Sequence, residues 1–200
     1  MKKYICLLLL GALISSCTQR TQVREEYKII STLYDSLAQR IPIPPPGIGI
    51  VGQKDSLRIM RAFTDIRDSL NSVKQIVAVN PYMEPVHLDS EKFSDEQKKL
   101  VIQLNSLSSS KPLNVDKIHT LNNDSIVPFE NLHLRKTSAD FNQINRLISY
   151  SRIAINSSGT EAALVVTTGT SRLDQHTAIY FLKKISNKWY LREFKILSIS

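Results

Sequence analysis

The last sixty residues of the chain, 141–200, alternate short β-rich runs with residues that favour turns. Two connections, 156–160 and 186–188, carry Asn and Ser, which are typical of tight turns. The run at 177–184 has apolar side chains at consecutive positions, so both of its faces are apolar and we expect it to be a central strand. This pattern predicts an antiparallel sheet of about four strands. The β-rich runs cover residues 144–155, 162–168, 177–184 and 188–199.

Helical periodicity is found in the first half of the chain. Over 23–39 the apolar residues recur at intervals of four, three, four and three, which places them on one face of a helix. A second apolar stripe predicts a helix over 55–73. A third helix is expected to start at Ser94, because Ser94 and Gln97 have the spacing of a capping box. The apolar face of the first helix consists of Val23, Tyr27, Ile30, Tyr34 and Leu37.

The remaining segments join these helices to the sheet. Prolines are too dense in 41–47 for a helix or a central strand, so an extended connector is expected there. Residues 75–79 have the composition of a strand. Together the elements predict one α+β domain over 23–200, with N-terminal helices packed on the C-terminal antiparallel sheet; it is helical over 23–110 and β-rich over 141–200.

Residues 1–16 have the layout of a signal peptide. Lys2 and Lys3 precede an apolar stretch that is shorter than the roughly 20 residues needed to span a bilayer. The next residues, Ile14-Ser15-Ser16-Cys17, resemble the lipobox of bacterial lipoproteins. That resemblance implies that Cys17 receives lipid, including acyl chains such as palmitate, and becomes the mature N-terminus, with 17–22 as a short tether. An ordinary secretory signal with a chance cysteine is the alternative.

The lipobox resemblance also suggests a location in the cell envelope. Thr18 follows Cys17, whereas Asp at this position favours retention in the inner membrane of lipoproteins, and no acidic run follows. We therefore expect the periplasmic face of the outer membrane. The chain has only two cysteines, and Cys6 is lost with the signal, so no disulfide is expected.

The C-terminal segment resembles a group of uncharacterised bacterial lipoproteins and secreted proteins. The shared features are Ser151-Arg152, a strand of small residues at 161–166, and Asn187-Lys188-Trp189. Members of this group often carry a Cys-Gly pair and a second Cys after the small-residue strand, whereas the segment 167–176 has none. The resemblance implies the fold and the location and implies no reaction.

The sequence has no recognisable catalytic or metal-binding motif. The histidines do not have the spacing that places two ligands on one metal ion, so neither a metal nor a cofactor is expected. Ser171, Asp174 and His176 invite comparison with a catalytic triad, but they lie in one turn-like segment without a nucleophile elbow. No catalytic residue is therefore assigned. The histidines are His87, His119, His133 and His176.

Four Asp-Ser-Leu or Asp-Ser-Ile triplets are more than composition predicts. They resemble the O-glycosylation sites of one group of bacteria that is rich in lipoproteins. The alternative is local structure, since Asp-Ser also starts helices, as at Asp55-Ser56. The candidate glycosylation sites are Ser36, Ser56, Ser69 and Ser125.

The positive charge is concentrated in the predicted sheet. The whole chain has a net charge of +8, and residues 141–200 contain 8 basic and 3 acidic residues. An anionic lipid or an acidic envelope protein would suit this charge, and so would a solvated sheet face; nucleic acid is not expected as a partner. The sequence favours a non-enzymatic, lipid-anchored binding module of the envelope. The alternatives are a small envelope hydrolase without a recognisable motif and an inhibitor or immunity-type lipoprotein.

Overall fold

The computed structural model describes residues 21–38, 61, 64–65, 69, 74–121, 124–129, 144–171 and 174–199. The predicted connector at 41–47 lies outside these residues. Of the predicted helix at 55–73, only residues 61, 64–65 and 69 are described, and all of them are helical.

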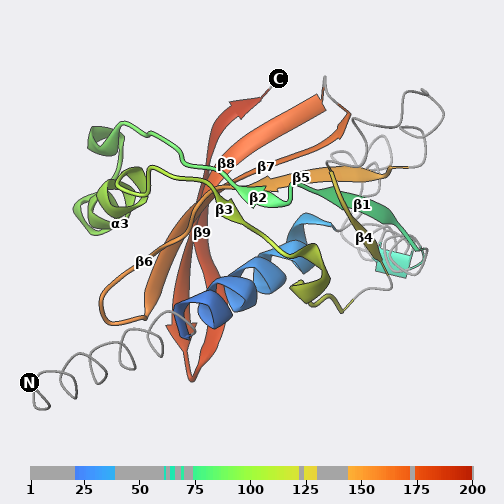
Figure 1. Cartoon of the computed structure of the whole chain (residues 1–200), viewed down its shortest axis with the longest axis horizontal. Coiled ribbons are helices and arrows are strands. Elements are labelled where there is room, and N and C mark those ends of the chain that lie inside the picture. Colours follow the sequence, from blue (N-terminus) through green and yellow to red (C-terminus); the bar gives the residue numbers. More distant parts are fainter. Residues whose placement is uncertain are drawn as a thin grey trace, which may run out of the picture.

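A seven-stranded mixed sheet forms the centre of the molecule (Figure 1). Its strand order is β4-β1-β5-β7-β8-β9, with β6 also paired to β7. The strands are β1 (Ile76–Val79), β4 (Ser125–Pro128), β5 (Arg146–Tyr150), β6 (Ala154–Ile155), β7 (Glu161–Ser171), β8 (Asp174–Ile185) and β9 (Lys188–Ile199). A separate two-stranded sheet pairs β2 (Tyr82–Met83) with β3 (Lys111–Pro112).

The sheet is larger than the four antiparallel strands predicted, and the prediction of a purely antiparallel sheet is wrong. Strands β5 to β9 do pair antiparallel, but β1 lies between β4 and β5 and is parallel to both. Residues 75–79 were expected to form a strand and do so as β1. The parallel pairing was missed because β1 and its partners are separated by long crossover connections, for which a local hydrophobic pattern gives no signal.

Helices cover both faces of this sheet. The helix over residues 21–37 shares a hydrophobic cluster with Tyr180 and Leu182 of β8, whereas α3 (Asp95–Asn105) packs with Ile179 and Phe181. Successive side chains of a strand point to opposite faces, so the two helices lie on opposite sides of β8. Figure 1 shows them apart, helix 21–37 in blue and α3 in green. The prediction that 177–184 is a central strand with two apolar faces is confirmed.

Specific hydrogen bonds hold the ends of these helices. The first helix is described over 21–37 and ends two residues before the end of the predicted 23–39. Its last carbonyls accept hydrogen bonds from side chains of the sheet region: Gln75 donates to Ala38 O at 3.0 Å and Arg146 donates to Leu37 O at 2.7 Å. The helix α3 begins after Ser94 as predicted, and Ser94 N donates to Gln97 Oε1 at 3.2 Å. Two short 3₁₀ turns, η2 (Ser90–Lys92) and η3 (Val115–Lys117), complete the described helical elements.

Two buried tyrosines in the core differ in how their hydroxyls are satisfied. Tyr34 donates to Asp124 Oδ2 at 3.2 Å, but Tyr150 Oη has no hydrogen-bond partner in the described part of the chain. Burial, and then the charges of Asp35 and Tyr180, raise the pKa of Tyr150 above its usual value, so the hydroxyl stays neutral. A buried hydroxyl without a partner carries a desolvation penalty that no bond offsets.

We therefore predict opposite results for two matched substitutions. Tyr150→Phe should leave the free energy of unfolding unchanged or raise it by up to about 1 kcal/mol, because it removes only an unsatisfied group. Tyr34→Phe should lower the free energy of unfolding by about 1 kcal/mol, because it removes a hydrogen bond. Urea unfolding monitored by circular dichroism measures both. A loss on Tyr150→Phe as large as that on Tyr34→Phe would contradict the assignment.

Candidate ligand-binding groove

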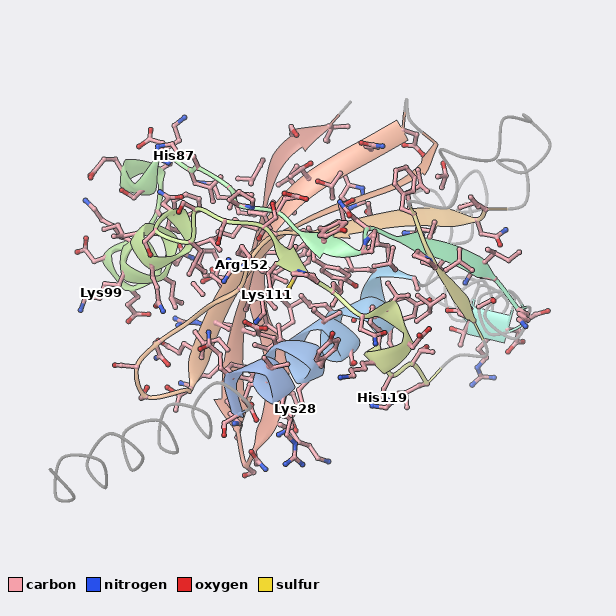
Figure 2. All side chains as sticks on the ribbon, in the orientation of Figure 1. Lys28, His87, Lys99, Lys111, His119 and Arg152 are labelled. Carbon is pink, nitrogen blue, oxygen red and sulfur yellow. The ribbon has the colours of Figure 1, made fainter. Side chains whose placement is uncertain are left out.

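A groove of about 760 Å³ lies between helix 21–37, the segment that follows η3, and the β8–β9 hairpin. Each of these elements contributes side chains to its walls. The lining residues are Val23, Arg24, Tyr27, Lys28, Ser31, Thr32, Lys117, His119, Asn187, Lys188, Trp189 and Tyr190. Figure 2 labels Lys28 on the helix and His119 beside η3.

Hydrogen bonds attach the segment around η3 to the helix. The Tyr27 hydroxyl accepts a hydrogen bond from Asn114 N at 2.9 Å, and Ser31 Oγ accepts one from His119 N at 3.0 Å. Tyr27 and Ser31 are four residues apart, so both project from the same side of the helix. This side borders the stripe of buried residues, since Tyr27 and Ser31 are half-buried and Tyr27 also packs against the core. The helix thus buries one face in the core and forms one wall of the groove with a second.

The opposite wall is the β8–β9 hairpin. Its two turn residues, Ser186 and Asn187, have φ of 46° and 66°, and such left-handed residues allow a tight two-residue hairpin turn. The turn predicted at 186–188 is therefore confirmed. It places Asn187 and Lys188 in the lining of the groove and directs Trp189, only 4 % exposed, into the core beneath helix 21–37.

Glu25 joins the two walls behind the groove. Its carboxylate accepts hydrogen bonds from Lys28 Nζ at 2.8 Å and from Trp189 Nε1 at 2.9 Å, and it pairs with Lys184 Nζ at 2.7 Å. Burial alone would raise the pKa of Glu25, but the hydrogen bonds from Lys184, Lys28 and Trp189 outweigh it and lower the pKa to about 2. The ionised carboxylate thus fixes the helix to the hairpin across 164 residues of sequence.

The groove is cationic and partly aromatic. Four of its lining side chains are basic, and no carboxylate lines it in the described part of the chain. Lys28 pairs with Glu25, whereas Arg24, Lys117 and Lys188 form no ion pair with any described residue. Lys117 Nζ lies 5.8 Å from the centre of the Tyr27 ring, so the lining of the groove places a positive charge beside an aromatic surface. An anion with an organic group attached is the ligand that matches these side chains.

Most basic residues of the β-rich half serve the fold and do not form a binding surface. Five of these basic residues each contact another segment of the fold. They account for much of the positive charge noted in 141–200. These contacts join Arg146 to Leu37 O, Arg152 to Ser109 O, Lys184 to Glu25, Arg192 to Glu96 and Lys195 to Lys92 O. The charge that faces the groove comes instead from Lys188 and from the helical half of the chain.

None of the three predicted modification sites that the structure describes lines this groove. Ser36 and Ser69 are exposed and Ser125 is half-buried at the start of β4, while Cys17 and Ser56 lie outside the described residues. Two of the neighbouring aspartates have structural partners: Asp35 accepts from Thr120 Oγ1 at 2.8 Å and Asp124 accepts from Tyr34. These two aspartates thus have partners in the fold, which leaves the glycosylation of the neighbouring serines a prediction.

The described histidines belong to separate segments of the fold, whereas Ser171 and Asp174 lie opposite each other where β7 and β8 pair. His87 is exposed in a loop and His119 lines the groove, while His133 lies outside the described residues. Ser171 and Asp174 belong to the adjoining ends of β7 and β8 and not to the turn-like segment expected. His176 contacts Thr168 at 2.9 Å and Asp174 accepts from Thr170 at 2.6 Å, so each is engaged with β7. Within the described ranges, no three His, Cys, Asp or Glu residues form a group that could hold a metal ion.

Sequence reasoning did not find the groove. Tyr27 was assigned to the apolar face of a helix and Trp189 to the final strand, and Lys117 and His119 belong to no recognisable motif. An available signal was that residues 23–28 combine apolar side chains with adjacent basic residues at Arg24 and Lys28.

Comparison with known protein families, with curated proteins and with solved structures finds no match for this chain. No helix among the described residues is both long and apolar enough to cross a membrane.

The low pKa of Glu25 predicts how acid affects the fold. A carboxylate with a depressed pKa stabilises the folded state above its ordinary pKa of 4.5, and this stabilisation is lost as the pH falls toward 2. Glu25→Gln should therefore reduce the free energy of unfolding by about 1–2 kcal/mol at pH 7. The difference from wild type should shrink between pH 4.5 and pH 2.

Urea unfolding over this pH range measures the effect, and Asp116→Asn, at an exposed carboxylate of η3, is the control. The control should change the free energy of unfolding by no more than about 0.5 kcal/mol. A destabilisation by Glu25→Gln that stays constant from pH 7 to pH 2 would exclude the role given to this carboxylate.

Proposed function

We propose that this protein is a lipid-anchored binding module of the cell envelope and that the groove binds the phosphate-bearing headgroup of an anionic lipid. The observation that carries this proposal is the set of basic side chains and aromatic rings in a groove whose described lining has no carboxylate. Lys and Arg attract a phosphodiester, and the rings of Tyr27 and Tyr190 offer surface to the organic part of the ligand. No reaction is assigned to the groove.

The position of the groove in the sequence supports a ligand at the membrane. The described part of helix 21–37 begins four residues after Cys17, and its residues Val23 and Arg24 line the groove. Four residues span at most about 14 Å when fully extended. A lipid on Cys17 would therefore hold the groove close to the bilayer surface, where anionic headgroups are concentrated.

The lipid anchor is tested by replacing each of the two cysteines separately. In a bacterial host that processes lipoproteins, Cys17→Ala should abolish the incorporation of labelled palmitate and move the protein from the detergent phase to the aqueous phase on Triton X-114 partition. Cys6→Ala is the matched control and should keep both properties, because Cys6 lies within the predicted signal. Equal palmitate labelling of Cys17→Ala and wild type would exclude Cys17 as the anchor.

Ligand binding is measured through Trp189, the only tryptophan in the chain, which lines the groove. Glycerophosphoglycerol, the deacylated headgroup of phosphatidylglycerol, should change the emission of the full chain in a saturable way. Glycerophosphocholine, which has the same phosphodiester but no net charge, should bind at least about tenfold more weakly. Raising the salt concentration should weaken the binding, because the attraction is between charges in contact with solvent.

Charge reversal in the groove should remove this response. Lys117→Glu combined with Lys188→Glu should weaken binding at least about tenfold, because each basic residue near an anionic group contributes about 1 kcal/mol. The control is Lys99→Glu, at an exposed lysine on α3, away from the groove (Figure 2). An equal loss with the control, or equal responses to the two headgroups, would exclude the proposal.

A further inference from the structure

The strand β9 forms one edge of the large sheet. It is 12 residues long, pairs with β8 on one side, and has no strand on its other side in the described part of the chain. All its residues except Trp189 are exposed. A long edge strand offers unpaired N–H and C=O groups along its length and is a template for a further strand.

One face of β9 is entirely apolar. The pairing of β9 with β8 has two irregularities, at Phe181/Leu182 and at Thr177/Ala178. Each interrupts the alternation of side chains along β9. As a result, five apolar residues of β9 lie on the face of the sheet that helix 21–37 covers. Helix 21–37 buries only the first of them, Trp189, whereas Phe194 and Ile196 remain 56 % and 51 % exposed. The apolar residues, with their partners on β8, are Trp189 (Lys184), Leu191 (Leu182), Phe194 (Tyr180), Ile196 (Ala178) and Ile199 (His176).

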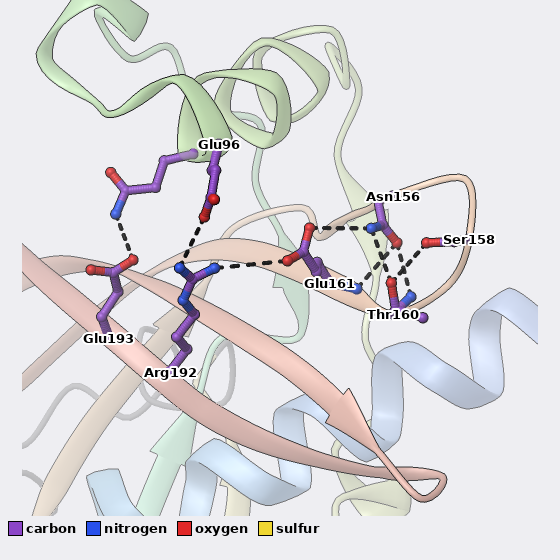
Figure 3. A network of polar contacts seen from close by, with 8 residues as sticks. Glu96, Asn156, Ser158, Thr160, Glu161, Arg192 and Glu193 are labelled. Carbon is purple, nitrogen blue, oxygen red and sulfur yellow. Dashed lines mark hydrogen bonds and ion pairs between the residues drawn. The ribbon is translucent and has the colours of Figure 1, made fainter.

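The opposite face of β9 carries charges that α3 and its flanking residues hold in place. Glu193 accepts a hydrogen bond from Gln97 Nε2 at 2.6 Å, and Arg192 pairs with Glu96 at 2.9 Å (Figure 3). Lys195 donates to Lys92 O at 2.9 Å. On the apolar face, Phe194 stacks on Tyr180 with ring centres 5.7 Å apart. The side chains at the middle of the edge are thus ordered before any partner binds, which lowers the entropic penalty of association.

We propose that β9 pairs antiparallel with β9 of a second copy of this chain, about a two-fold axis at Phe194. Glu193 and Lys195 lie on the same face, one on each side of Phe194. An axis at Phe194 therefore places each Glu193 opposite Lys195 of the second copy, and the symmetry forms this pair twice. It also brings the two exposed Phe194 rings together.

The charges select this register over its neighbours. Residues directly opposite in an antiparallel pair share a face, so the next registers move the axis by one residue. One of them sets Glu193 against Glu193, and the other sets Lys195 against Lys195. Both place like charges opposite each other, which is destabilising. Among these registers, only the one centred on Phe194 places Glu193 of each copy opposite Lys195 of the other.

Disulfide trapping tests the register on the full chain in a neutral detergent. Phe194→Cys should form a disulfide-linked dimer on mild oxidation, since directly opposite residues lie about 4.5–5.5 Å apart between Cα atoms. Glu193→Cys and Lys195→Cys chains should link to each other when mixed. Neither should link to itself, because its copies would be about 7–8 Å apart.

The wild-type chain, oxidised in the same way, controls for Cys6 and Cys17. Equal self-linking by Lys195→Cys and Phe194→Cys would overturn the register. Monomeric wild type in sedimentation equilibrium at about 100 μM, with no trapping of Phe194→Cys above the wild-type level, would overturn the dimer.

Charge exchange tests the ion pairs. Glu193→Lys and Lys195→Glu should each weaken the dimer at least about tenfold, because each replaces two attractive pairs with two repulsive ones. The double variant restores opposite charges across the axis and should recover dimerisation to within about threefold of wild type. It loses the contacts of both residues with the α3 region, so recovery cannot come from that side. A double variant weaker than either single variant would overturn the proposal.

Discussion

The strand β8 sets the main requirement of this fold, because its apolar side chains alternate between two faces that must both be covered. Tyr180 and Leu182 require a cover on one side, and Ile179 and Phe181 require one on the other. Helix 21–37 meets the first requirement and α3 the second. Each helix comes from the half of the chain that has little sheet of its own, so the helices and the sheet depend on each other to bury their apolar faces.

Features that depend on neighbouring residues could be predicted from the sequence, whereas features that depend on residues far apart in the chain could not. The bounds of β9 and the central position of β8 follow from neighbouring residues, and both could be read from the sequence. The strand at 75–79 could be predicted, but its parallel partners could not, since Ile76 pairs with Ser125, far along the chain. The irregularities in β9 also escape prediction, because a strict two-residue alternation would divide Leu191 and Phe194 between opposite faces.

The groove could not be predicted from the sequence for the same reason. Its residues come from one helix, one 3₁₀ turn with its flanking segment, and one hairpin, and none of these segments has a motif that identifies it alone. What brings them together is the carboxylate of Glu25, whose partners Lys28, Lys184 and Trp189 come from both ends of the described chain. Local pattern predicted the helix and the hairpin turn, whereas the groove between them is a property of the completed fold.

The contact between Glu25 and Trp189 also has a consequence for when this protein folds. Glu25 and Trp189 are 164 residues apart, and the helix packs against β8 and β9 far along the chain from it. The apolar face of the helix can therefore find its native cover only after that hairpin has been synthesised. Contacts of such wide sequence separation slow folding, because the chain must close a long loop before they form. Until the β8–β9 hairpin is available this face stays uncovered, and exposed apolar surface of this kind favours aggregation during folding.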